Sequence, residues 1–178
     1  AGDDPVIVHT ELGDITITSG TTGTLEVTNP NTEDVYNDAS TLDNSITSVE
    51  GGNFEQLTPS TDTVTANIAD TIDATKVTLT ATDSVEAGED ITYTASVDNT
   101  PETDLVITLS NGAEITIEAG KTTGSVTVAS SDDVYGQTDG TTENVSITGT
   151  TGGNYESLDT SDTATTTVTE PTADETTV

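Results

Sequence analysis

The stretch VTLTATDSVEAGEDITYTASV, residues 77–97, contains two short runs in which apolar and polar side chains alternate. Every second residue of these runs is apolar: Val77, Leu79 and Ala81 in the first, then Ile91, Tyr93, Ala95 and Val97 in the second. Successive side chains of a β-strand point to opposite faces, so a period of two places each apolar set on one face. The stretch therefore predicts two strands that each bury one face.

Five further runs with the same period follow, separated by turns rich in Gly, Asn and Asp: DLVITL (104–109), EITIE (114–118), GSVTVA (124–129), NVSITG (144–149) and TATTTVT (163–169). Threonine fills most outward positions, which suits an exposed sheet face. No ten consecutive residues show a helical stripe. Seven short strands predict an antiparallel β-sandwich of the immunoglobulin type, and this pattern outweighs the disorder that high net charge would otherwise favour.

The two halves of the chain repeat with an offset of 99 to 101 residues. The matching pairs are GGNFEQL (51–57) with GGNYESL (152–158), DTVTANI (62–68) with DTATTTV (162–168), and PVIVH (5–9) with LVITL (105–109). The first half lacks counterparts of the opening two strands. Upstream sequence, a shortened variant or an insertion that splits the domain would each account for the missing pair.

The predicted organisation has four parts, which are an incomplete repeat over residues 1–69, an acidic linker over 70–76, a complete repeat over 77–170 and the start of another linker over 171–178. A period near one hundred residues indicates whole domains in tandem rather than a solenoid of short repeats.

The charge of the chain is strongly negative, with 33 acidic residues against two lysines and a formal net charge of −31. Nucleic acids and anionic membrane surfaces bind basic patches, so both are excluded as partners. No apolar stretch is long enough to span a bilayer, so we expect no direct membrane insertion. The chain has no cysteine, which excludes disulfides and thiolate metal sites.

The acidic residues fall mainly in loops at the ends of the predicted strands, and many gather near the linker. Crowded carboxylates repel one another unless cations bind them, and calcium takes six to eight oxygen ligands in flexible geometry. We therefore predict several Ca²⁺ ions, with the alternative that the acids only form a solubilising surface. The candidate ligands are Glu33, Asp34, Asp38, Asp70, Asp73, Asp98, Asp104, Asp132, Asp133, Asp139 and Glu156.

One acidic phrase occurs twice, as EDVY at residues 33–36 and DDVY at residues 132–135. Our interpretation is an ion-binding loop that recurs where each repeat ends. Tyr36 and Tyr135 are expected to pack rather than to bind a ligand.

The sequence contains few residues suited to catalysis. AGKTT (119–123) resembles the end of a phosphate-binding loop, but it joins two predicted strands instead of opening a helix. His9 is the only histidine, and there is neither a cysteine nor a G-x-S-x-G motif. We expect no enzymatic activity.

The order of these phrases over residues 77–169, and in part over 5–68, resembles the tandem extender repeats of large bacterial RTX adhesins. The resemblance implies immunoglobulin-like domains that calcium rigidifies at their linkers, with ligands such as Asp34, Asp70, Asp73 and Asp133. It also implies a monomeric rod on the cell surface, tethered at the outer membrane. Its partners would be neighbouring repeats and, in transit, a type I secretion system.

Two other functions stay open. A carbohydrate- or protein-binding module could use the same sandwich, although four tyrosines and one phenylalanine are scattered rather than clustered as a sugar platform. A surface-layer repeat would share the spacer role.

Overall fold

The structure is a computed structural model that describes residues 4–31, 33–131 and 140–169. Contacts divide the chain into two compact units. The first comprises residues Ala1–Glu33 and Asp38–Thr71, and the second comprises Ile72–Val178 together with the four residues Asp34–Asn37.

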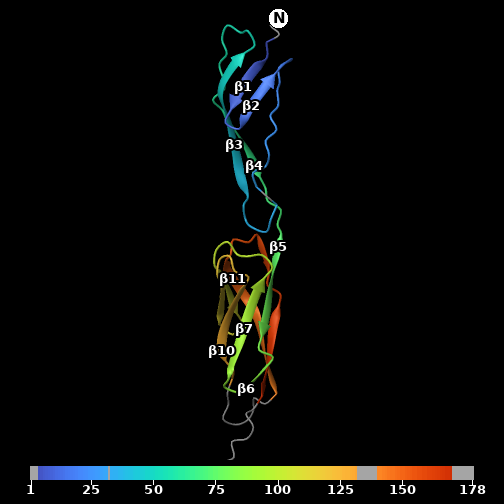
Figure 1. The fold of residues 1–178 in the computed structure, drawn as a ribbon, viewed down its shortest axis with the longest axis vertical. Helices are drawn as coiled ribbons and strands as arrows, with labels where there is room; N and C mark the ends of the chain where they lie inside the picture. The colour runs from blue at the N-terminus through green and yellow to red at the C-terminus, as the bar shows by residue number, and fades with distance from the viewer. Residues whose placement is uncertain (1–3, 32, 132–139, 170–178) are drawn as a thin grey trace, which may run out of the picture. The chain divides into compact units, whose positions relative to one another are not determined.

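The second unit contains nine strands among its described residues, and no helix (Figure 1). They are β5 (Ala74–Ala81), β6 (Ser84–Glu86), β7 (Asp90–Val97), β8 (Leu105–Leu109), β9 (Glu114–Ile117), β10 (Thr123–Ala129), β11 (Thr141–Gly152), β12 (Ser157–Asp159) and β13 (Thr163–Thr169). One sheet has the order β10-β7-β5-β12 and the other β6-β13-β11-β8-β9. Each of the seven predicted runs forms a strand.

Two short strands of this unit were not predicted from the sequence. β12 pairs in parallel with β5, and β6 pairs in parallel with β13, with three residue pairs in each case. The remaining pairings in the unit are antiparallel.

The core of the second unit consists of the apolar sets that the alternation predicts. In β5 and β7, Val77 pairs with Val97 and Leu79 with Ala95, and all four side chains are buried. The other sheet adds inward residues to the same hydrophobic cluster: Leu105, Ile107, Leu109, Ile115, Ile117, Val145 and Ala164. A core that draws on the inner faces of two sheets is consistent with a β-sandwich.

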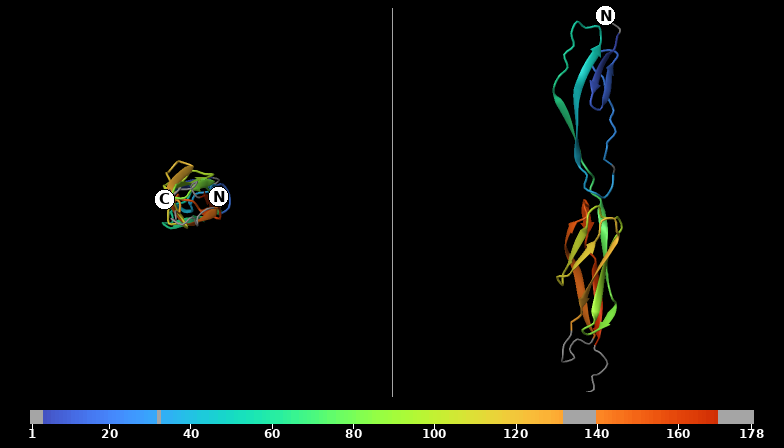
Figure 2. Two further views of the ribbon diagram at one scale, coloured as in Figure 1. Left: turned by 90° about the horizontal axis from the view of Figure 1, so that it is seen from below. Right: turned by 60° about the vertical axis from the view of Figure 1, so that its left-hand side comes forward.

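The first unit forms one four-stranded sheet, which Figure 2 shows in blue to green at a second angle. Its strands are β1 (Val6–Thr10), β2 (Gly13–Ile17), β3 (Ser40–Gly51) and β4 (Thr63–Ile68), in the order β2-β1-β3-β4. By sequence, β1 corresponds to β8 of the second unit, β2 to β9, β3 to β11 and β4 to β13. Among the described residues of the first unit, none is fully buried.

Strand pairing corrects the alignment of the two repeats by one residue. Val6 lies opposite Gly51, as Leu105 lies opposite Gly152. LVITL therefore matches VIVHT rather than PVIVH, so the counterpart of His9 is Thr108 and not Leu109. The difference matters because a slip of one residue would exchange the inner and outer faces of the strand.

Candidate functional site

The GGN phrase of each repeat is a turn that requires glycine. The backbone φ angles of Gly152, Gly153 and Asn154 are +81°, +82° and +59°, a left-handed conformation that Gly and Asn tolerate best. A side chain at Gly152 would place its Cβ 2.0 Å from the carbonyl oxygen of Asp104. The turn ends β11 and is followed directly by Tyr155.

The four residues Asp34–Asn37, which contain the DVY phrase, pack against this turn as part of the second unit. The amide of Asn37 donates to the carbonyl of Asn154 at 3.1 Å, and the amide of Glu156 donates to the carbonyl of Val35 at 3.0 Å. Tyr36 and Tyr155 form an isolated antiparallel bridge between these two hydrogen bonds. The segment therefore binds the turn as a very short added strand.

The two tyrosines of this bridge also stack, with ring centroids 5.7 Å apart and planes at 27°. Each hydroxyl donates to a backbone carbonyl, Tyr36 to Thr100 at 2.6 Å and Tyr155 to Asn99 at 2.5 Å. Burial raises the pKa of Tyr155 to about 12, and the nearby Tyr36 acts in the same direction. Tyr36 thus packs, as the sequence suggested, although it lies half-buried at a loop rather than in the core.

Several predicted calcium ligands lie in these loops and accept hydrogen bonds from the backbone. In the second unit, the carboxylate of Asp34 accepts from the amide of Tyr36 at 2.8 Å, and that of Glu156 accepts from the amide of Asp73 at 2.6 Å. In the first unit, Asp70 accepts from the amide of Asp38 at 3.3 Å. These carboxylates therefore help to fix the loop backbone.

The remaining predicted ligands are dispersed. The carboxylate of Asp104 accepts from the amide of Ala119 at 2.9 Å and so ties two loops together. Glu33 and Asp98 are exposed. Three more candidates lie outside the described residues: Asp132, Asp133 and Asp139.

Comparison with known protein families agrees with the repeat seen in sequence and fold. A family model described as the LapA domain matches residues 1–71 and again residues 73–172. The chain belongs to the LapA domain family. Neither a search of curated proteins nor a search of solved structures gave a match.

LapA is a large adhesin-associated protein involved in biofilm, so membership associates this chain with cell-surface adhesins. The two LapA matches follow one another along the chain, one in each half. Within the described residues there is no helix long and apolar enough to cross a membrane.

The donor chemistry of these LapA loops fits a hard cation such as Ca²⁺. All the side chains concerned are carboxylates, and a carboxylate that accepts one N–H bond keeps further lone pairs for a metal ion. In the parts of the chain that the structure describes, however, no three His, Cys, Asp or Glu residues form a group that could hold a metal. The ligand sets therefore stay a prediction.

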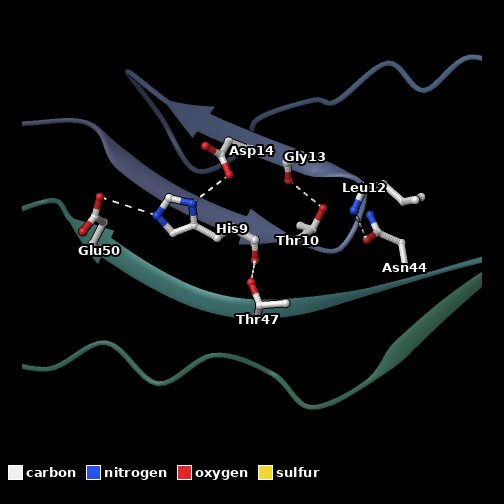
Figure 3. A network of polar contacts seen from close by, with 8 residues as sticks. All are labelled: His9, Thr10, Leu12, Gly13, Asp14, Asn44, Thr47 and Glu50. Atoms are coloured by element: carbon white, nitrogen blue, oxygen red, sulfur yellow. Dashed lines mark hydrogen bonds and ion pairs between the residues drawn. The ribbon is translucent and has the colours of Figure 1, made fainter.

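A charged contact in the first LapA unit was not found from the sequence (Figure 3). His9 lies opposite Asp14 in the β1–β2 hairpin, with its Nδ1 2.7 Å from the Asp14 carboxylate, and its Nε2 is 3.5 Å from the Glu50 carboxylate. The hydrogen bond with Asp14 raises the pKa of His9, Glu50 acts in the same direction, and partial desolvation opposes them. The contact joins β2, β1 and β3 across one face of the sheet.

Proposed function

We propose that this chain is part of the extender region of a cell-surface adhesin, with immunoglobulin-like LapA repeats that hold a ligand-binding domain away from the bacterial surface. The observation that supports this role best is that the second unit includes the Asp34–Asn37 segment of the preceding repeat. The second folded unit therefore does not consist of one sequence repeat alone, as expected for consecutive domains of a continuous spacer. The protein would be secreted by a type I system and remain tethered at the outer membrane.

We propose further that several Ca²⁺ ions stabilise this region. A net charge of −31 on 178 residues disfavours the compact state through self-repulsion. Cations that bind the folded state alone would offset this repulsion by mass action. The residues that would hold them are the loop and linker carboxylates, among them Asp34, Asp38, Asp70, Asp73 and Glu156.

Thermal unfolding followed by circular dichroism in calcium, in magnesium and in chelator tests the calcium proposal. An ion present at 100 times its dissociation constant adds about 2.7 kcal/mol, which corresponds to a rise in Tm on the order of 10 °C for a domain near 100 residues. Asp70→Asn and Asp73→Asn should reduce a calcium-specific rise. Glu114→Gln removes a charge from an exposed position of the edge strand β9. It is the matched control and should leave the calcium-specific rise intact.

If the chain stays folded in chelator and has the same Tm in all three solutions, the calcium proposal is wrong and the acidic residues only form a solubilising surface. Small-angle scattering tests the spacer role independently, because calcium should reduce the spread of conformations of the whole chain. Equal scattering with and without calcium would contradict a calcium-rigidified spacer, and binding to a glycan array would favour a carbohydrate-binding module instead.

A further inference from the structure

One face of the first unit's sheet is uncovered, although its counterpart in the second unit forms the core. Ile115 of β9 and Ala164 of β13 are 0% and 4% exposed, because β5 and β7 contribute to the same hydrophobic cluster. Their equivalents in the first unit are Ile15 and Val64. Ile15 is only partly buried, and Val64 is 70% exposed.

A cavity of about 340 Å³ lies on this uncovered face. Its lining includes Thr10, Ile15, Ile46 and Val64. The equivalent residues of the second unit belong to its core or pack against it: Leu109, Ile115, Ile147 and Ala164. The cavity therefore occupies the place where the second unit has its own β5 and β7 side chains.

The chain that follows β2 shows which strand is missing. In the second unit, β10 lies close to β9 at Gly124, because a Cβ at this position would be 2.2 Å from the Thr116 carbonyl oxygen. Gly23 makes the equivalent approach, since a Cβ there would lie 2.6 Å from Ile15 and 2.9 Å from the Thr16 carbonyl oxygen. Residues 23–28 thus begin in the position of β10.

Those residues nevertheless pair with no strand in the described chain. In the second unit, β10 is held by seven residue pairs to β7, from Thr123 opposite Ser96 to Ala129 opposite Asp90. The described residues of the first unit contain no equivalent of β7. The alternating sequence GTLEVT therefore has no strand to pair with among them, and its Val27 side chain is 43% exposed.

We propose that the uncovered face of the first unit is an acceptor site for an antiparallel strand pair with the pattern of β5 and β7, the opening strands of a LapA repeat. The β7-like strand would pair with residues 23–28, and the alternate apolar side chains of both strands would fill the cavity. Strand addition of this kind gains affinity from main-chain hydrogen bonds and specificity from alternate side-chain pockets. The proposal is independent of the calcium and spacer roles.

A synthetic peptide of residues 72–101, which carries both strands, tests the site on the full chain labelled with ¹⁵N. We expect saturable NMR shifts at Ile15, Ile46 and residues 23–28, together with new protection of these amides from hydrogen exchange. A peptide with Leu79→Asp and Ala95→Asp would bury two charges and should bind at least about tenfold more weakly.

Matched variants of the chain locate the site. Val64→Asp places a charge on the proposed acceptor face and should weaken binding by at least about tenfold. Thr63→Asp places the same charge on the opposite face of β4 and should not. Because Val64 is mostly exposed, the substitution leaves the fold of the first unit intact.

Duplicating residues 72–101 before Asp4 through a flexible linker removes the entropic cost of binding a free peptide. In this chain we expect a higher unfolding temperature for the first unit and unchanged exchange in the second. The proposal is overturned if neither the peptide nor the fusion protects residues 23–28. A concentration-dependent dimer that the peptide does not dissociate would also overturn it, because a second copy would then be the occupant.

Discussion

The aromatic ring of Tyr36 stacks on that of Tyr155 at a centroid separation of 5.7 Å, and a backbone bridge joins the same two residues. Tyr36 belongs to the DVY phrase of the first repeat's sequence, and Tyr155 follows the GGN phrase of the second. Two phrases that each occur twice in the chain are therefore complementary to one another.

Tyr36→Ala should destabilise the second unit by about 2 kcal/mol, because it removes an aromatic stack and a hydroxyl hydrogen bond. Phe54→Ala is the matched control, since Phe54 follows the other GGN phrase but is 62% exposed. We expect that change to cost no more than about 0.5 kcal/mol. Chemical denaturation of the two variants measures both effects, and equal losses would show that the stack contributes nothing.

Tyr155 should lose its proton only near pH 12, and ultraviolet absorbance during an alkaline titration measures this. Its folded pKa is raised, so the stabilising effect of the neutral hydroxyl is complete below about pH 10 and is lost as the pH rises towards 12. Tyr36→Leu removes the neighbouring hydroxyl and should lower the pKa of Tyr155. A Tyr155 signal that titrates near pH 10 would contradict the buried environment.

His9 should titrate above its ordinary pKa of 6.5 in the folded chain. The contribution of its protonated ring to stability is complete below pH 6.5 and is lost as the pH rises through the raised value. Asp14→Asn should lower this pKa, as measured by NMR of the ring protons. Glu11→Gln removes an equal charge from the adjoining loop, and an identical shift in that variant would rule out a specific contact.

Equivalent isoleucines allow a comparison of the two units. Ile115→Ala creates a cavity at a side chain that is 0% exposed and should cost about 2–5 kcal/mol. Ile15→Ala makes the same change on the uncovered face of the first unit and should cost about 1 kcal/mol, because Ile15 is only partly buried. Hydrogen exchange separates the two units, and equal losses would mean that the face of Ile15 is covered in solution.

The main strands of the second unit could be predicted because apolar and polar residues alternate along them, and the apolar ones, such as Val77 and Leu79, are buried. β6 and β12 could not, since each has only three residues and exists through pairing with a distant strand. The sequence also could not show that residues 23–28 form no strand. Apolar and polar residues alternate in 23–28 as they do in β10. The two segments differ because β10 has β7 as a pairing partner and residues 23–28 have none among the described residues.

The candidate site was predicted in position but not in detail. The clustering of acids in loops was visible in the sequence. Whether a carboxylate binds a backbone amide, as Asp34 and Asp70 do, depends on loop geometry that composition does not specify. The recurrence of the DVY and GGN phrases indicated that both matter to the structure. The sequence did not show that Tyr36 of one phrase contacts Tyr155 beside the other. The contact of His9 with Asp14 required the hairpin register.

The two parallel strand pairs of the second unit bear on its resistance to a pulling force. β5 and β6 begin the main sequence of this unit, and they pair in parallel with β12 and β13 near its end. Tension applied at the two ends pulls such partners in opposite directions along their length, so their hydrogen bonds share the load and must break together. An antiparallel hairpin pulled at its open end gives way one bond at a time. We therefore expect these short strands to limit mechanical unfolding. Single-molecule pulling should then find a rupture force that depends on these few residue pairs rather than on the size of the core.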